Sequence, residues 1–169
     1  MNIFVLDNDP LLAAHFHCDQ HVVKMTLETA QLLSTEAWRI GMWDNGLYLP
    51  THAKHPCTLW LADNPSAIYW MCRLGYALAN EYSRRFNKTH KTEVVINNAI
   101  AAVGAYYEIG YKKVPPPFKF AQAMPEEFKN PESVVAYHQY YQHKYDSWKL
   151  DKRKAMRYTN TEPPYWLKT

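Results

Sequence analysis

Five side chains that can exchange protons or bind phosphate lie at regular intervals near the start of the chain. They are separated by steps of four, three, four and three residues, so on one continuous helix they would share a side. This polar row consists of His17, His21, Lys24, Glu28 and Gln31. A solvated helix edge usually carries interchangeable lysines, arginines and glutamates, whereas this row offers a proton donor or acceptor at nearly every turn. The spacing favours two interpretations, a working site or a solvated helix edge.

Lys24 and Glu28 are the members of the polar row best suited to catalysis. A carboxyl group can act as general acid or base, and a lysine amine can form an imine. His21 would then orient the substrate or bind its phosphate, with His17 and Gln31 as further substrate contacts. The alternative for Lys24 and Glu28 is an ordinary i,i+4 ion pair, which stabilises a helix by about 0.2–0.5 kcal/mol.

The loop sequence THAKHPC contains three further side chains that can bind substrate or metal, His52, His55 and Cys57. Either histidine would complete the site by contacting substrate. Together with residues of the polar row, these side chains could instead bind zinc, although their spacing matches no standard zinc motif. The alternative metal site comprises His17, Cys18, His21, His52, His55 and Cys57, whereas the main interpretation has no metal and no cofactor.

Basic residues gather at two other places. Arg84 and Arg85 lie at the end of an expected helix, where they suit the helix dipole and are available to phosphate. Between positions 137 and 158, tyrosines and histidines alternate with cations that include Lys152 and Arg153. Cations mixed with stacking rings are typical of proteins that bind single-stranded or distorted nucleic acid. The alternative is an amphipathic helix that packs its tyrosines inward.

Helices must position these residues. The pairs Asp9-Pro10 and Asn64-Pro65 predict helix starts, because the first side chain caps free N–H groups and proline suits the first helical position. The expected elements are an apolar arm (3–6), one long helix or two joined at a kink (10–39), a loop or hairpin (41–56), helices over 65–86, 92–107 and 131–157, a proline-rich linker (114–117) and a break at 124–125.

Composition indicates the fold class. The chain has 169 residues, of which 47% are apolar and 21% charged, so we expect one globular domain over 1–169. The net charge of +3 is too small to indicate nucleic-acid binding by itself. Three cysteines indicate reduced thiols, and no segment predicts a leader or a membrane span, so we expect a cytoplasmic protein, in the host cytoplasm if phage-encoded, with no membrane partner. The prediction is an all-α, single-domain helical bundle with a long central N-terminal helix and proline-rich connecting loops.

The segment Asp19-Gln20-His21, with Glu28 seven positions after the histidine, resembles the pyrimidine-dimer DNA glycosylases of the phage endonuclease V type. The resemblance covers about the first half of the chain. It implies a small all-helical protein in which Glu28 is catalytic and His21 lies near DNA phosphate. A second long helix with a basic end and an aromatic-basic tail at 165–168 are looser points of similarity.

The chain departs from that family at three positions. The family's nucleophile is the α-amine of an N-terminal threonine, whereas Asn2 follows Met1 here, and Leu27 and Gln31 stand where the family has arginines. The opening of the chain also resembles small phage and bacterial proteins of no known function. We predict cleavage of a nucleobase N-glycosidic bond, in DNA, with or without AP lyase activity, or in a nucleotide. The alternatives are a metal-dependent hydrolase and a non-catalytic nucleic-acid-binding protein.

Overall fold

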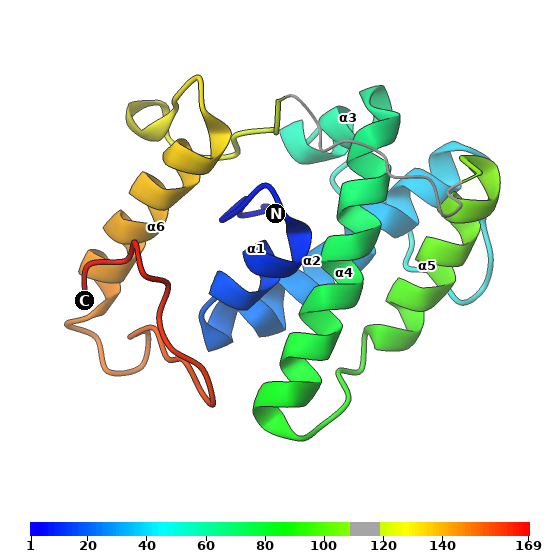
Figure 1. Ribbon diagram of the computed structural model, residues 1–169. Helices are drawn as coiled ribbons and strands as arrows, with labels where there is room; N and C mark the ends of the chain where they lie inside the picture. Colours follow the sequence, from blue (N-terminus) through cyan, green and yellow to red (C-terminus); the bar gives the residue numbers. More distant parts are fainter. Residues whose placement is uncertain (109–118) are drawn as a thin grey trace.

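The computed structural model describes residues 1–108 and 119–169, and all regular secondary structure in these ranges is helical. α4 crosses α2, α5 packs against both, and α6 lies on the other side of the N-terminal segment (Figure 1). No described helix combines the length and apolar content needed to cross a membrane. The all-α prediction is confirmed. The elements are α1 (Pro10–Phe16), α2 (Asp19–Arg39), α3 (Pro56–Asp63), α4 (Pro65–Phe86), α5 (Glu93–Tyr106), the 3-10 turn η1 (Glu126–Phe128) and α6 (Ser133–Trp148).

Proline begins helices where the sequence predicts. The side chain of Asp9 accepts the N–H of Leu11 at 2.8 Å, and Pro10 occupies the first position of α1. α4 begins at Pro65 and is followed by Asn87, whose φ of 51° lies in the left-handed region that commonly ends helices. The predicted helices over 65–86 and 92–107 are therefore confirmed to within a residue or so at each end.

The segment over 10–39 forms two helices, the second of the two predicted arrangements, and they are separated by extended backbone at His17 and Cys18. The N–H of Cys18 donates to the Tyr141 hydroxyl at 2.8 Å, and the N–H of Asp19 donates to the Arg157 carbonyl at 2.8 Å. Residues far away in the sequence thus accept the backbone N–H groups at the break between α1 and α2. Tertiary contacts, rather than glycine or proline, separate α1 from α2.

Two helical segments differ from the prediction. α3 was not predicted, since the expected loop over 41–56 includes only its first residue, Pro56. The ring of His55 caps α3 by accepting the N–H of Cys57 at 3.2 Å. α6 ends at Trp148, so the predicted helix through Arg157 is wrong beyond that residue, where Asp151 begins a turn by accepting nearby N–H groups. The linker predicted at 114–117 lies outside the described residues.

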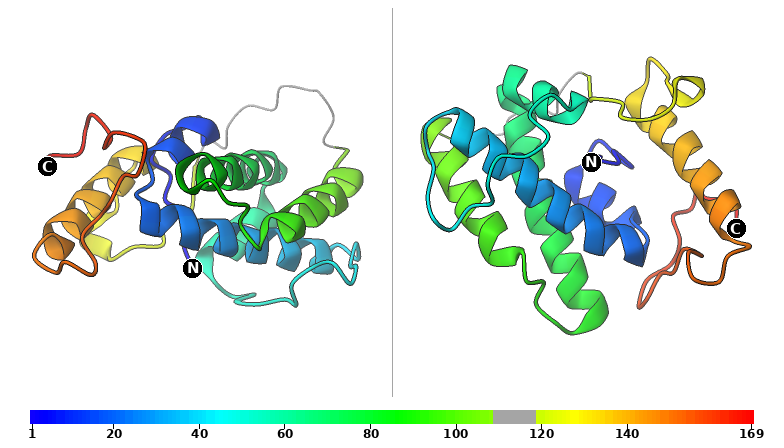
Figure 2. Two further views of the ribbon diagram at one scale, coloured as in Figure 1. Left: turned by 90° about the horizontal axis from the view of Figure 1, so that it is seen from below. Right: turned by 180° about the vertical axis from the view of Figure 1, so that it is seen from behind.

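One apolar core includes both ends of the described chain. The predicted arm, Ile3–Leu6, is buried, and α6 contributes Tyr137 and Tyr141, which are fully buried. The last residues lie beside α6 (Figure 2). The rings of Trp166 and His138 stack there, with centroids 3.7 Å apart. The N-terminal segment therefore lies between α6 and the other helices.

A buried cation connects three helices. The guanidinium of Arg85 on α4 is fully buried and binds the carboxylates of Glu81 at 2.8 Å and Asp19 at 3.2 Å. It also donates to the backbone carbonyls of His15 and His17, each at 2.7 Å. Because a buried charge must be paired and hydrogen-bonded, these contacts link the end of α1 and the start of α2 to α4.

Replacing Arg85 should strongly destabilise the fold. Arg85→Ala leaves two backbone carbonyls without their donor and Asp19 without its positive partner, and it should lower the free energy of unfolding by about 3–5 kcal/mol, measured by urea denaturation at pH 7. The matched control is Arg84→Ala, which removes a half-exposed cation and should cost no more than about 1 kcal/mol. Equal losses in the two variants would contradict the structural role of Arg85.

Candidate functional site

Glu28 lies near the middle of α2 and is only 8% exposed. Its Oε2 accepts the backbone N–H of Asn2 at 2.7 Å. Its Oε1 lies 3.6 Å from Nζ of Lys24 and 3.9 Å from the α-amine of Met1. One largely buried carboxylate thus has two primary amines beside it, one from its own helix and one from the start of the chain. We call these four residues the amine–carboxylate site.

The side chain of Asn2 holds the first residues of the chain against Glu28. Its Oδ1 accepts the N–H groups of Ile3 at 2.7 Å and Phe4 at 3.0 Å, and its Nδ2 donates to the carbonyl of Ala123 at 2.8 Å. Met1 and Asn2 are therefore site residues that the spacing of polar side chains does not reveal. The signals for them in the sequence are the apolar run that follows, which favours burial of the whole segment, and the resemblance to a family whose nucleophile is an N-terminal α-amine.

Four of the five residues of the polar row lie on α2, and His17 does not. His17 is the C-cap residue of α1 and is fully buried. The prediction of one continuous row on a single helix is therefore wrong for His17. Lys24, with 65% of its side chain exposed, and the partly exposed Gln31 lie one turn either side of Glu28. His21 is buried. The accessible part of the row is therefore centred on the carboxylate.

The two buried histidines make their contacts within the protein. His17 donates from Nδ1 to the carbonyl of Ala13 at 2.6 Å, and His21 Nδ1 is hydrogen-bonded to the Tyr141 hydroxyl at 2.9 Å. The ring of Phe4 covers His21, with centroids 4.4 Å apart. Burial lowers the pKa of His17 to about 4 and lowers the pKa of His21 well below its ordinary value. Neither ring is the exposed cation that the predicted phosphate contacts require.

The loop before α3 lies against the C-terminal half of α2. The N–H of Thr51 donates to Oγ1 of Thr35 at 3.1 Å. His52 is exposed and His55 is partly exposed. Burial lowers the pKa of His55, and the positive N-terminal amine lowers it further, while the negative charge of Glu28 opposes both.

The six residues of the alternative metal site are not assembled. Among residues 1–108 and 119–169, no three histidine, cysteine, aspartate or glutamate side chains come together in an arrangement that could bind a metal ion. Burial raises the pKa of Cys18 and raises that of Cys57 to about 12. Zinc binds the thiolate form, which these environments disfavour.

The predicted basic residues divide between structural and exposed positions. Arg85 is buried in the ion pairs described above. Arg84 donates to the carbonyl of Asn160 at 2.8 Å, which brings the basic end of α4 against the tail that follows α6. Lys152 and Arg153 are exposed on that tail. The exposed cations Lys152 and Arg153 therefore belong to a segment that contacts the basic end of α4.

The aromatic residues of α6 have two different roles. Tyr137 and Tyr141 belong to the core, as the amphipathic interpretation predicts. On another side of the helix, Nζ of Lys144 lies 4.9 Å from the ring of Tyr140 and 5.0 Å from that of Trp148. These three side chains are partly exposed, so a cation among rings remains accessible on α6.

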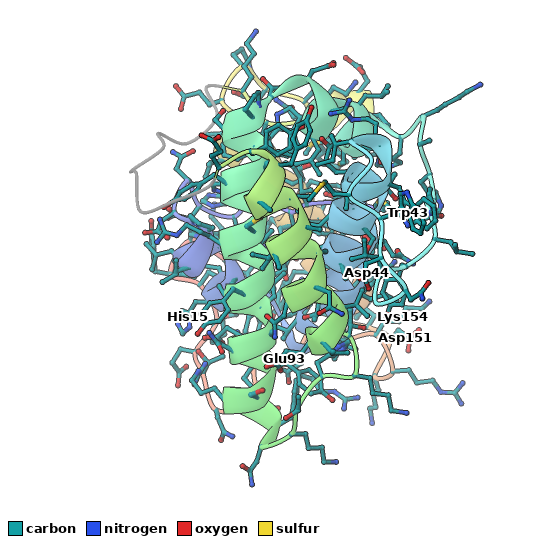
Figure 3. The ribbon with its side chains drawn as sticks, turned by 90° about the vertical axis from the view of Figure 1, so that its right-hand side faces the viewer. His15, Trp43, Asp44, Glu93, Asp151 and Lys154 are labelled. Carbon is teal, nitrogen blue, oxygen red and sulfur yellow. The ribbon has the colours of Figure 1, made fainter. Side chains whose placement is uncertain are left out.

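A cavity of about 870 Å³ lies between α4 and α5, which run side by side in Figure 3. Its walls are mostly apolar and include Tyr69, Tyr76 and Ile100, with Arg73 and Asn97 as polar members. No residue of the polar row lines it. The cavity is therefore separate from the amine–carboxylate site.

Comparisons of the chain with family models, with curated proteins and with solved structures give no match. The geometry around Glu28 and the sequence pattern of α2 are therefore the basis for a functional conclusion.

The buried His17 should make stability depend on pH. Its pKa is about 4 in the folded protein against 6.5 when exposed, so the unfolded chain binds more protons between these values. The free energy of unfolding should fall as pH drops from 6.5 to 4, by up to roughly 1.4 kcal/mol per pH unit from this group. Urea denaturation across this range tests it.

His17→Asn keeps a side-chain N–H for the Ala13 carbonyl but cannot titrate, so its pH dependence should be flatter. His143→Asn, on the exposed side of α6, is the control and should retain the wild-type slope. A wild-type slope in His17→Asn would show that His17 is not the titrating group.

Proposed function

We propose that this protein is an enzyme that cleaves the N-glycosidic bond of a nucleobase in DNA, with an amine of the amine–carboxylate site as nucleophile. The observation that supports this most directly is Glu28, a largely buried carboxylate with two primary amines beside it. Imine chemistry at a sugar requires both groups, because the amine bonds to carbon and the carboxylate manages the protons.

In the proposed reaction the amine nitrogen bonds to C1′ of the sugar while the bond from C1′ to the base breaks. Glu28 accepts the proton that the amine loses and passes it to the departing base. A further proton, delivered through the same carboxyl group from solvent, reaches O4′ as the bond from C1′ to O4′ breaks. The product is a positively charged imine, which the Glu28 carboxylate stabilises. Elimination of the 3′ phosphate from this imine would add AP lyase activity.

Two amines qualify as the nucleophile. Nζ of Lys24 is exposed and can reach a substrate without rearrangement of the chain. The α-amine of Met1 is more enclosed, but it occupies the chemical position of the nucleophile in the family that the segment from Asp19 to Glu28 resembles. Either amine would leave a covalent product at a different residue, and cleavage at Asp7, Asp9 or Asp19 separates Met1 from Lys24, so the two can be distinguished.

DNA is the favoured substrate because accessible cations extend beyond the site. Lys24 adjoins Glu28, Lys144 lies among rings on α6, and the tail carries Lys152 and Arg153. These charges can bind successive phosphates, and the rings can stack on a base that has left the duplex. A free nucleotide would use only the cations nearest the carboxylate.

Borohydride trapping tests the proposed chemistry. Wild-type protein incubated with DNA that contains damaged or abasic sites should form a covalent adduct, which peptide mapping should locate on Lys24 or Met1. Glu28→Gln should reduce single-turnover base release by about 10²-fold or more, because the proton acceptor is lost. Glu126→Gln on η1, an exposed carboxyl group, is the matched control and should leave the rate unchanged.

The results also separate the alternatives. Base release without an adduct would indicate a hydrolase that activates water, and DNA binding without base release would indicate a non-catalytic binding protein. If Lys24→Arg still forms the adduct, Lys24 is not the nucleophile and the α-amine remains. Wild-type protein that releases no base from any damaged or modified DNA overturns the proposal.

The cations of the tail after α6 should bind DNA phosphates whatever the nucleotide sequence of the DNA. Replacing both Lys152 and Arg153 with glutamine should weaken DNA binding and reduce the slope of log K against log salt by about 0.9 for each phosphate that these cations neutralise. The control is the double change of Lys119 and Lys129 to glutamine, at the opposite end of α6, which should keep the wild-type slope. Fluorescence anisotropy over a range of salt concentrations measures both, and an unchanged slope in the tail variant would exclude this surface.

A further inference from the structure

We propose that the cavity between α4 and α5 is a binding site for a medium-chain carboxylate, an elongated apolar molecule with one negative charge at its end. The inference goes beyond the proposed function and does not depend on it, because no residue of the amine–carboxylate site lines the cavity. The volume of about 870 Å³ lies within the range typical of small-molecule sites. The shape of the cavity, its apolar walls and the cation at its edge together indicate this class of ligand.

The cavity follows one face of α4. The α4 residues that line it begin at Tyr69 and end at Glu81, in alternating steps of three residues and one residue. This spacing keeps them on one side of the helix over a length of about 18 Å. α4 and α5 approach closely at Gly75, where an added methyl group would lie 3.4 Å from Cγ2 of Ile96. The cavity lies beside this contact, and a ligand that fills its length is elongated rather than compact.

Small side chains leave the space between the helices open. Cys72 and Ala77 are buried and form the floor of the cavity, and Ala101 on α5 is exposed at its edge. Tyr76 and Leu11 also line the cavity, although they are 61% and 50% exposed. Exposed apolar side chains gathered around a hollow are typical of a binding site. An aliphatic chain that lies along the floor would cover them.

Arg73 provides the charge that selects an anion. Its side chain is exposed at the edge of the cavity, with Cζ 5.8 Å from the centroid of the Tyr69 ring. None of the ion pairs formed by the described residues includes Arg73. Glu81, the carboxylate that lines the other end of the cavity, is already bound by the guanidinium groups of Arg84 and Arg85. The cavity therefore offers a cation that has no carboxylate partner in the described part of the chain.

A carboxylate is the anion that fits a single guanidinium. Its two oxygens match two parallel N–H groups of the guanidinium, and one negative charge balances one positive charge. A nucleotide phosphate carries more negative charge and would require further cations, whereas Arg73 is the one cation among the described residues that line the cavity. Because the walls are mostly apolar, a hydrocarbon chain suits the remainder of the molecule.

Isothermal titration calorimetry with hexanoate, octanoate and decanoate tests the contributions of the chain and the charge. We expect the affinity to rise by about fourfold for each added methylene group, because each group leaves water. Decanol and decyltrimethylammonium have a chain of the same length with no charge or with a positive charge, and they should bind at least about tenfold more weakly than decanoate. Undetectable binding of decanoate, equal affinities across the series, or equally tight binding of the neutral or cationic molecule would overturn the proposal.

Two variants locate the binding. Arg73→Gln should weaken decanoate binding by about tenfold or more and leave decanol binding unchanged. The matched control is Arg153→Gln, which removes an exposed arginine from the tail and should bind decanoate like the wild type. Ala101→Trp places a large ring at the edge of the cavity and should abolish the binding of both molecules. Because the replaced side chains are exposed, melting temperatures measured by circular dichroism should stay near that of the wild type.

The variants also define what would contradict the inference. Decanoate that still binds to folded Ala101→Trp binds elsewhere, and an unchanged affinity in Arg73→Gln removes the carboxylate contact, so either result overturns the site. If Ala101→Trp unfolds, Arg73→Gln decides alone. Displacement of decanoate by a lower concentration of deoxyadenosine monophosphate would assign the cavity to a nucleotide and overturn the acyl ligand. None of these measurements involves base release, so this inference and the proposed function can fail separately.

Discussion

A guanidinium inside a helix bundle requires an acceptor for nearly every donor, and Arg85 obtains them from two carboxylates and two backbone carbonyls. The carbonyls belong to the end of α1 and the carboxylate of Asp19 begins α2, so the cation determines how these two helices meet. Each residue of a helix turns by about 100°, and fixing the first turn of α2 therefore fixes the direction of every later side chain. Glu28 faces the N-terminal segment as a result.

The local chemistry of helix starts could be predicted from the sequence, and contacts between distant residues could not. Proline after an aspartate or asparagine marks α1 and α4 because the cap depends only on neighbouring residues. The break before Asp19 depends on Tyr141 and Arg157, which no local pattern reveals. The end of α6 was also not predictable from local pattern. The residues after Trp148 have a composition that suits a helix, but the chain forms a turn at Asp151 instead.

The candidate site was partly predictable for the same reason. Lys24, Glu28 and Gln31 share an accessible side of α2 because helical spacing is local, and His17 fails to join them because the break lies between. Asn2 counts against an N-terminal nucleophile in the sequence, yet its side chain makes the contacts that bring the first residues to Glu28. Residue type alone does not reveal which partners a flexible terminus will find.

The tail after α6 has a consequence for the order of folding. Thr159 donates from its backbone N–H and its hydroxyl to the carboxylate of Asp19, across a separation of 140 positions. The first turn of α2 therefore obtains these hydrogen bonds only after Thr159 has been synthesised, 140 positions later. Contacts of such separation slow folding, because a long loop must close before they form. An emerging chain would expose the first part of α2, including the turn that leads to Lys24, until Thr159 left the ribosome.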